Sequence, residues 1–281
     1  GMFHFMSWAA PYVVSPENPR FWFNADTFEP LINSPGHVQA LEDLAEMIDY
    51  GPRGMISWTL GEAWDLFLKG DAVLTFTWGD LGSLAQDEEE SVVKGKLGCA
   101  LMPGTMRAYD PIDEEWVDFD EPNLVGNTTG GSWHGVISVL SDAPRATYDY
   151  LAYMATKENA FWNFTRGWTG VDPGRTFAFL EPYGTAEVED YVEQGWNADD
   201  VTTYTNAFYK CFSEEQQLPY LMIPGTNEYW RALDVQINKV VSGQKSAQEA
   251  LDDTYENYKK ITERYGKDAQ HELFKASLNL E

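Results

Sequence analysis

The chain has 281 residues, with 19 Lys and Arg against 45 Asp and Glu, so its formal net charge is −26. This balance argues against a nucleic-acid partner, because phosphate backbones are bound by clusters of cationic side chains, and it disfavours anionic membrane surfaces for the same reason. A hydrophobic share of 43% provides for a folded core, and no stretch approaches the roughly 18 apolar residues of a membrane span, so we expect no membrane insertion.

The start of the chain and its cysteines indicate little about its compartment. Gly1-Met2 resembles a scar left by cleavage ahead of a start codon, and no signal peptide follows it. Cys99 and Cys211 allow at most one disulfide within the chain, and neither belongs to a CxxC motif or a Cys/His cluster. We expect both to be buried as small hydrophobic residues, and the sequence leaves their bonding state open.

In chain order, the first predicted helices have clear end signals. Ser34-Pro35 is typical of a helix start, and an apolar stripe at helical spacing follows it until Gly51. Thr59 and Glu62 have the spacing of a capping box, which predicts a second, short helix that ends at Gly70.

Three β-rich runs are predicted to be strands. They are residues 72–78, 97–102 and 136–140. A helix that begins near residues 142–144 follows the third run, so strands and helices alternate along this part of the chain. Such alternation is typical of an α/β sheet with helices packed against it, which is the fold class we predict.

The last part of the chain is predicted to be almost entirely helical. Apolar residues at helical spacing occupy residues 227–243. Ser246 and Glu249 then form another capping box, before a helix that ends at Gly266.

Acidic segments are interpreted as solvated surface. Residues 110–121 and 181–200 are expected to form loops or helix faces rather than metal or partner sites. The acidic run 88–90 receives the same interpretation, because it lacks the ligand spacing and the turn glycine of a calcium loop.

No catalytic signature is found. The chain has no GxSxG, no HExxH and no phosphate-binding glycine loop, and its four histidines lie far apart without the spacing of metal ligands. Two of the many carboxylates would suffice for a glycoside hydrolase, but the sequence does not tell whether two of them face one cleft. We therefore expect a protein that is not an enzyme and has no metal and no cofactor, and we keep a carbohydrate-active enzyme as the alternative.

Tryptophans at chain breaks point to a ligand. Trp is seldom fully buried, and 11 tryptophans are more than a core readily absorbs. Trp78 ends a predicted strand and is followed by Gly79 and Asp80, and open α/β sheets bind ligands at the carboxyl ends of their strands. Flat ring faces beside carboxylates and amides suit a sugar or polyol, which offers C–H groups and hydroxyls.

Two further tryptophans have comparable settings. Trp133 follows Gly130-Gly131, where glycines let the backbone come close to a ligand. Tyr229 and Trp230 lie in the first turn of a predicted helix, whose free N–H groups favour acceptor oxygens. A structural role is equally open for each tryptophan taken singly.

Several sequence segments, taken in order, carry a resemblance to a known family. They are GPRG at 51–54, GEAWDLFLKGDAVLTFTWGDLGS at 61–83, VVKGKLGCALMPG at 92–104, GGSWHGVISVLSDAP at 130–144, IPGTNEYWRALDVQINKVVSGQKSAQEAL at 223–251 and GKDAQHELFKASL at 266–278. Together they resemble the C-terminal half of bacterial extracellular solute-binding proteins of the maltose-binding-like cluster, the receptors of ABC sugar importers. The resemblance covers nearly all of the chain.

The resemblance implies a periplasmic-binding-protein-like fold of type II, in which two α/β lobes close over a ligand in the cleft between them. It also implies a set of ligand-binding residues in this sequence. These are Tyr12, Trp78, Asp80, Gly131, Trp133, Arg175, Tyr229 and Trp230.

By the family's topology, residues 1–132 and 180–281 are expected to form the second, C-terminal lobe, with a mixed sheet flanked by helices. Residues 133–179 are expected to be a remnant of the first lobe with the hinge crossing, so that the chain resembles a truncated receptor. Such a remnant is expected to expose an apolar face, which a second copy of the chain would cover in a homodimer.

The expected function is binding of a sugar or polyol for delivery to ABC permease subunits, in the periplasm. Binding is expected to be weak or absent in a truncated form, because affinity depends on desolvating the ligand between two lobes. A glycoside hydrolase and an interaction module without a small ligand are the alternatives.

Overall fold

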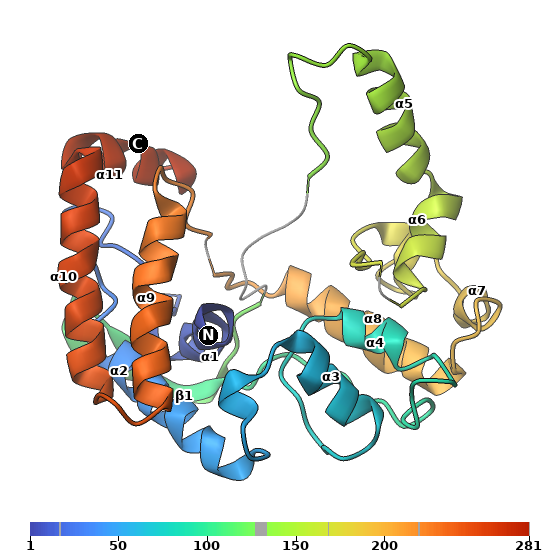
Figure 1. The fold of residues 1–281 in the computed structure, drawn as a ribbon, viewed down its shortest axis with the longest axis horizontal. Helices are drawn as coiled ribbons and strands as arrows, with labels where there is room; N and C mark the ends of the chain where they lie inside the picture. The colour runs from blue at the N-terminus through green and yellow to red at the C-terminus, as the bar shows by residue number, and fades with distance from the viewer. Residues whose placement is uncertain (17, 127–133, 168, 219, 281) are drawn as a thin grey trace. The chain divides into compact units, whose positions relative to one another are not determined.

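Two units, each with its own core, make up the chain (Figure 1), and the structure, a computed structural model, describes residues 1–16, 18–126, 134–167, 169–218 and 220–280. Unit 1 comprises Gly1–Ser57, Met102–Gly131 and Glu214–Glu281. Unit 2 comprises Trp58–Leu101 and Ser132–Ser213. The lobe boundaries implied by the family resemblance, 1–132 with 180–281 against 133–179, stay a prediction.

Unit 1 consists mainly of helices and contains one small hairpin. Helices α9 and α10 lie side by side and pack on α1 and α2 (Figure 1). The elements described in this unit are α1 (Met2–Val13), α2 (Pro35–Glu46), 3-10 turns at Met47–Tyr50 and Met55–Ser57, β1 (Thr105–Asp110), β2 (Glu115–Asn123), α9 (Thr226–Val241), α10 (Ala247–Tyr265) and α11 (Lys267–Ser277).

Aromatic rings fill the core of unit 1. Phe23 stacks on Phe28 with ring centroids 4.4 Å apart, and its ring also meets that of Tyr258 at 5.8 Å. Tyr229 packs edge-on against Tyr258 at 5.0 Å. All four side chains are fully buried, so they supply much of the hydrophobic stabilisation of this unit.

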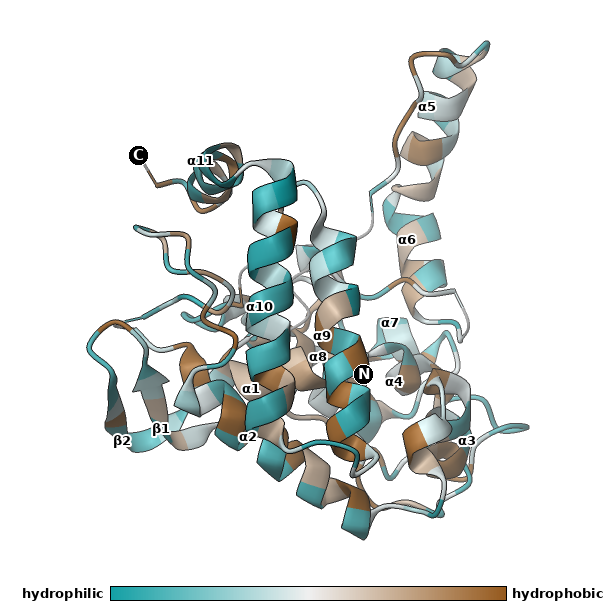
Figure 2. Ribbon diagram, turned by 60° about the vertical axis from the view of Figure 1, so that its left-hand side comes forward, coloured by the Kyte–Doolittle hydropathy of each residue, from teal (hydrophilic) through white to brown (hydrophobic). Residues whose placement is uncertain are grey.

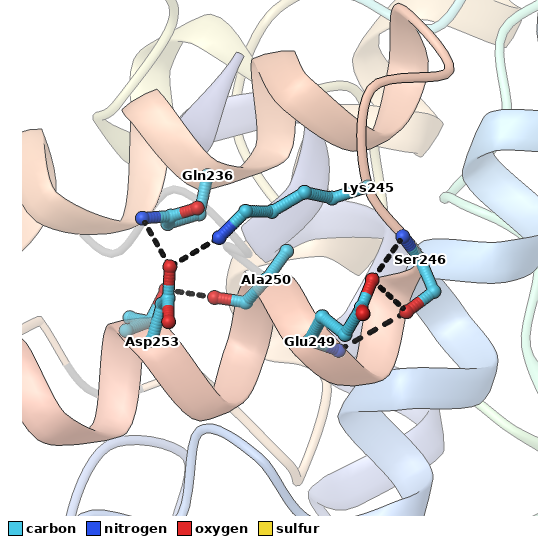
Figure 3. Close-up of polar contacts among 7 residues, drawn as sticks. Gln236, Lys245, Ser246, Glu249, Ala250 and Asp253 are labelled. Atoms are coloured by element: carbon cyan, nitrogen blue, oxygen red, sulfur yellow. Dashed lines mark hydrogen bonds and ion pairs between the residues drawn. The ribbon is translucent and has the colours of Figure 1, made fainter.

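The helix starts predicted from capping motifs are confirmed. Helix α10 begins at the capping box of Ser246 and Glu249 (Figure 3), in which the Glu249 N–H donates to the Ser246 hydroxyl and the Ser246 N–H donates to the Glu249 carboxylate. Thr59 and Glu62 form the same box in front of α3. Figure 3 also shows Lys245 paired with Asp253.

The acidic segment 110–121 is where our loop prediction is wrong. Most of it belongs to the antiparallel hairpin β1–β2, with Tyr109 opposite Trp116. The guanidinium of Arg107 lies over the ring of Trp116 at 4.4 Å. Apolar Val117 and Phe119 alternate with aspartates along β2, and this period-two pattern is typical of a strand that is solvated on one face.

Unit 2 combines short helices with long irregular segments. Its described elements are α3 (Leu60–Leu68), α4 (Asp80–Leu84), α5 (Pro144–Met154), α6 (Lys157–Phe164), a 3-10 turn at Thr176–Ala178, α7 (Val188–Val192) and α8 (Ala198–Ser213). Two apolar clusters hold it together. One gathers around Tyr191, Trp196 and Tyr204, and the other around Trp64 and Leu81. Cys99 packs against both clusters.

The structure corrects the burial that we expected for two cysteines and one aspartate. Cys99 and Cys211 are not joined in a disulfide, and both are only partly buried. Asp200, from the supposedly solvated segment 181–200, is 1% exposed. Its carboxylate accepts hydrogen bonds from the backbone N–H groups of Gly95 (2.8 Å) and Leu97 (3.1 Å), so it is a structural anchor.

None of the three predicted strands forms in the described part of the chain. Residues 72–78, 97–102 and 136–140 belong to no strand, residues 139–140 lie in a turn, and the sheet described in these ranges has two strands, β1 and β2. Val73 and Val139 are almost fully exposed, at 99% and 98%. Parts of the segment in front of α5 are brown, that is hydrophobic, in Figure 2. A strand needs a neighbour for its N–H and C=O groups, and apolar β-rich composition does not provide one.

Candidate functional site

In unit 1, Tyr12 is tied to α2 by a hydrogen bond. Its hydroxyl donates to the Asp43 carboxylate at 2.5 Å, and the Gln39 amide donates to the same carboxylate at 2.9 Å. Burial and then this carboxylate raise the pKa of Tyr12 well above its ordinary value, so the hydroxyl stays protonated. The phenol is therefore held in one place on the surface of α1.

Trp230, on α9, is the centre of an aromatic group in unit 1. Tyr220 meets the Trp230 ring edge-on with centroids 5.0 Å apart, and Phe3 does so at 6.0 Å. Phe3 is 39% exposed, whereas Trp230 is partly buried. The buried indole N–H of Trp230 has no hydrogen-bond partner among the described residues. These rings give unit 1 an aromatic surface with a hydrogen-bond donor still to be satisfied.

Tyr229 belongs to the core rather than to this surface. Its side chain has no exposed area, and its hydroxyl lies 2.9 Å from that of Thr262. Gln270 completes the network by donating to the carbonyl of Pro224 at 2.9 Å. Burial raises the pKa of Tyr229 to about 12. In this structure Tyr229 is a packing residue with satisfied polar contacts.

In unit 2, Trp78 and Asp80 flank a close approach of α4 to α8. Trp78 is 37% exposed, and Asp80 is the first residue of α4. A side chain at Gly79 would collide with the ring of Phe208, and one at Gly82 with the ring of Tyr204. The two glycines therefore allow the start of α4 to lie directly on the aromatic face of α8.

Two functional candidates near Asp80 were missed from the sequence. Asp172 has an exposed side chain, yet burial by the surrounding protein and then the charge of Asp80 raise its pKa to about 7. Tyr204 is 2% exposed, and burial, then the charge of Asp172, then smaller effects including the charge of Asp80 keep its pKa well above the ordinary value. The charge of Asp80 thus acts on Asp172, and the charges of both aspartates act on Tyr204.

Arg175 lies close to Asp172 in sequence but makes different contacts. Its guanidinium donates to the carbonyl of Ala155 at 2.9 Å and lies 6.0 Å from the centroid of the Phe177 ring. The family resemblance named Arg175, which ends the segment GVDPGR at residues 170–175. Asp172 lies in the same segment, three residues before Arg175, so its place in this segment is the sequence signal that could have identified it as a candidate.

The predicted site residues are divided between the two units. Tyr12, Tyr229 and Trp230 belong to unit 1, and Trp78, Asp80 and Arg175 belong to unit 2. Gly131 and Trp133 lie outside the described residues.

Neither a metal cluster nor a membrane helix is found in the described ranges. Within them, no three or more His, Cys, Asp or Glu side chains are grouped so that they could hold a metal ion. No helix described there is long and apolar enough to cross a membrane.

Comparison with known proteins identifies related sequences and folds. The family model described as bacterial extracellular solute-binding protein matches residues 1–194. A solute-binding protein of an ABC transporter from Agrobacterium vitis S4, with bound D-mannitol, is similar at a TM-score of 0.60 and 16% identity. Maltose-bound MalE3 of T. maritima is similar at a TM-score of 0.60 and 15% identity. An ABC solute-binding protein of Agrobacterium radiobacter K84 in complex with ribitol is similar at a TM-score of 0.59 and 17% identity.

The matches confirm the predicted fold class, a helix-rich α/β fold of the periplasmic-binding-protein kind. They cover 94%, 92% and 92% of this chain, in the order given above. The chain in turn spans 58%, 56% and 63% of those three structures, which is less than two thirds of their length.

Proposed function

Because the chain belongs to the family of bacterial extracellular solute-binding proteins, we propose that it binds a sugar or polyol as the receptor of an ABC importer. The proposal depends on the match between the family model and residues 1–194. Support comes from the similar structures, which hold D-mannitol, maltose and ribitol. The chain spans only part of those proteins, so ligand binding by this chain itself has to be measured.

Aromatic surfaces and carboxylates on the two units suit such a ligand. In the proposal, the rings of Trp230 and Trp78 contact C–H faces of the ligand, and Asp80 accepts hydrogen bonds from its hydroxyls. Tyr12 and Arg175 serve as further polar contacts. Gly131 and Trp133 belong to the proposal on the family resemblance alone.

Delivery to a membrane permease and an extracytoplasmic location complete the proposal. Both follow from the family, whose members are described as extracellular. The protein then works by binding and release, without catalysis. A charge of −26 keeps such a receptor soluble and adds little to the binding of a neutral sugar.

Isothermal titration of the 281-residue chain with D-mannitol, ribitol, maltose and glucose tests the proposal. We expect this chain to bind at least one ligand weakly, and we expect Trp78→Ala and Trp230→Ala each to weaken that binding by about 1–3 kcal/mol, the scale of one lost aromatic contact. Trp162→Ala is the matched control, because Trp162 is 52% exposed and is assigned no role in binding. Unchanged affinity in both variants would show that these tryptophans are structural.

A carbohydrate-active enzyme is the second candidate, and one observation favours it. Burial and then the charge of Asp80 raise the pKa of the Asp172 carboxyl to about 7, a range that suits the acid of a glycosidase. Hydrolysis of nitrophenyl glycosides that is lost in Asp172→Asn would establish catalysis. No hydrolysis by the unmodified chain would leave binding as the function.

A homodimer is a further part of the proposal. Val136, Val139 and Leu140 are exposed at 82%, 98% and 86%, and α5 buries none of its residues. A second copy is one partner that would cover these apolar side chains. Sedimentation equilibrium should then report twice the monomer mass, and a monomer at all concentrations would count against the dimer.

A further inference from the structure

Helices α9 and α10 of unit 1 flank a groove of about 620 Å³, which we call the α9–α10 groove. The two helices pack side by side (Figure 1). Three cationic side chains line the groove, Arg231, Lys260 and Arg264, against one carboxylate, Glu228. Its volume is in the range of small-molecule sites, roughly 300–1,000 Å³, so the groove is large enough for a small ligand.

Arg231 and Lys260 lie at the same level of this helix pair. Glu228, in the first turn of α9, forms an ion pair with Arg264, in the last turn of α10, so the two helices run antiparallel. Arg231 and Lys260 are each about one turn away from this ion pair, in the same direction along the two helices. Two like charges therefore lie opposite each other on neighbouring helices.

The charges of Arg231 and Lys260 have no counter-charge among the described residues. Neither side chain forms an ion pair or a hydrogen bond with any of them. The Glu228 carboxylate is already engaged, because it pairs with Arg264 and accepts a hydrogen bond from the Tyr265 hydroxyl at 2.6 Å. The lining of the groove therefore carries an excess of positive charge.

Gln236 and its acidic neighbour do not remove this excess. Gln236 lines the groove and is 5% exposed, and its amide donates to the Asp253 carboxylate at 3.4 Å. Lys245 pairs with the same carboxylate (Figure 3), so Asp253 is already balanced. Like charges held near one another cost folding free energy, and this chain has 45 Asp and Glu that could have balanced them. The arrangement favours an anion from outside the chain.

We propose that the α9–α10 groove binds the phosphate group of a small phosphate monoester. The inference goes beyond the proposed function, because it concerns a second ligand and a separate set of residues. The second pKa of such an ester is about 6, so at pH 7.5 its phosphate carries nearly two negative charges. Arg231 and Lys260 can both donate to it, and the Asn257 amide, which has no hydrogen-bond partner in the described ranges, lines the same groove.

Apolar side chains in the groove suit the organic part of the ester. Ala232, Val235 and Ile261 line it, and Val235 is 45% exposed. A bare inorganic phosphate would leave these side chains uncovered, whereas an ester with an apolar group would cover them. The net charge of −26 repels anionic membranes, so a soluble ester fits the groove better than the headgroup of a lipid.

Titration of the 281-residue chain with phenyl phosphate at pH 7.5 and low salt, followed by NMR of the backbone amides, tests the inference. We expect one saturable site, with the largest shifts in residues 228–236 and 257–264. Phenol, the neutral counterpart, should bind at least about tenfold more weakly, as for the loss of charge-assisted hydrogen bonds. Inorganic phosphate should also bind more weakly than the ester, and added salt should weaken both.

Four variants separate the groove from other surface cations. Arg231→Gln and Lys260→Gln should each weaken binding of phenyl phosphate by about tenfold. Arg53→Gln and Lys210→Gln are the matched controls, because both side chains are exposed and lie outside the groove, and they should leave the affinity unchanged. Without ligand, the groove variants should melt no lower than the unmodified chain, since each removes one of two facing like charges.

Several outcomes would overturn the inference. Phenol that binds as tightly as phenyl phosphate, or shifts confined to other parts of the chain, would refute an anion site in the groove. Equal affinity in the groove variants and their controls would show that Arg231 and Lys260 are ordinary solvated side chains. Benzoate that binds as tightly would refute the phosphate class, and binding to phosphatidylglycerol vesicles that both groove variants abolish would refute a soluble ester. Sugar binding is measured separately, so neither proposal fails with the other.

Discussion

Asp200 offers the sharpest test of how unit 2 is held together. Its buried carboxylate accepts hydrogen bonds from the side-chain amide of Gln86 (2.9 Å) and from the N–H groups of Gly95 (2.8 Å) and Leu97 (3.1 Å). One side chain at the start of α8 therefore fixes the segment that connects the two apolar clusters. Replacing it by alanine removes the acceptor of three donors, of which the Gln86 amide and the Leu97 N–H are in buried hydrogen bonds and the Gly95 N–H in a partly buried one.

The expected loss follows from those three bonds. A buried donor left unpaired costs about 1–3 kcal/mol, but neighbours relax and the contributions do not add fully, so we expect Asp200→Ala to cost about 3–5 kcal/mol. Asp200→Asn keeps one carbonyl oxygen and places an amide N–H₂ against a donor. We expect it to cost about 2–3 kcal/mol.

Urea unfolding monitored by tryptophan fluorescence measures these losses, and hydrogen exchange at the amides of Gly95 and Leu97 localises them. Asp199→Asn is the matched control, because Asp199 is an exposed aspartate in the same first turn of α8. Its loss should stay within about 0.5 kcal/mol, the usual range for a surface position. Equal stability of the Asp200→Asn and Asp199→Asn variants, with unchanged exchange at both amides, would refute the anchoring role.

Three further predictions concern unit 1. Burial lowers the pKa of His37 to about 3, so the stability that depends on neutral His37 is complete above pH 6.5 and is lost as the pH falls toward 3. By pH 4.5 we expect the free energy of unfolding, measured in urea, to fall by about 2–3 kcal/mol. This loss should be absent in His37→Gln and retained in His134→Gln. The Tyr258 hydroxyl is buried with no partner in the described ranges, so Tyr258→Phe should leave stability unchanged or raise it by up to about 1 kcal/mol, and a loss in thermal unfolding would reveal a partner. Ser246→Ala removes the cap of α10 and should cost about 1 kcal/mol in the same assay, whereas no change would mean that Glu249 caps the helix alone.

Local sequence determined the helix ends of this protein. A capping box is read within four residues, and Ser246 with Glu249 forms the predicted bonds because both partners belong to one turn of backbone. Helix α2 likewise begins at the predicted Ser34-Pro35, although the Ser34 side chain makes no capping hydrogen bond. Family membership was also readable from the sequence, since it depends on many short segments in order rather than on how they pack.

The tertiary structure decided which segments pair as strands and which charged side chains are buried. A strand exists only if another segment supplies its hydrogen bonds, so the apolar run 72–78 stays single while the acidic run 115–123 pairs in a hairpin. Asp200 reads as a surface carboxylate in the sequence and becomes a buried anchor because α8 meets a loop about a hundred residues earlier in the chain. Asp172 and Tyr204 depend on folding in the same way, because burial in the folded chain raises the pKa of both groups and neighbouring carboxylates add to the shift.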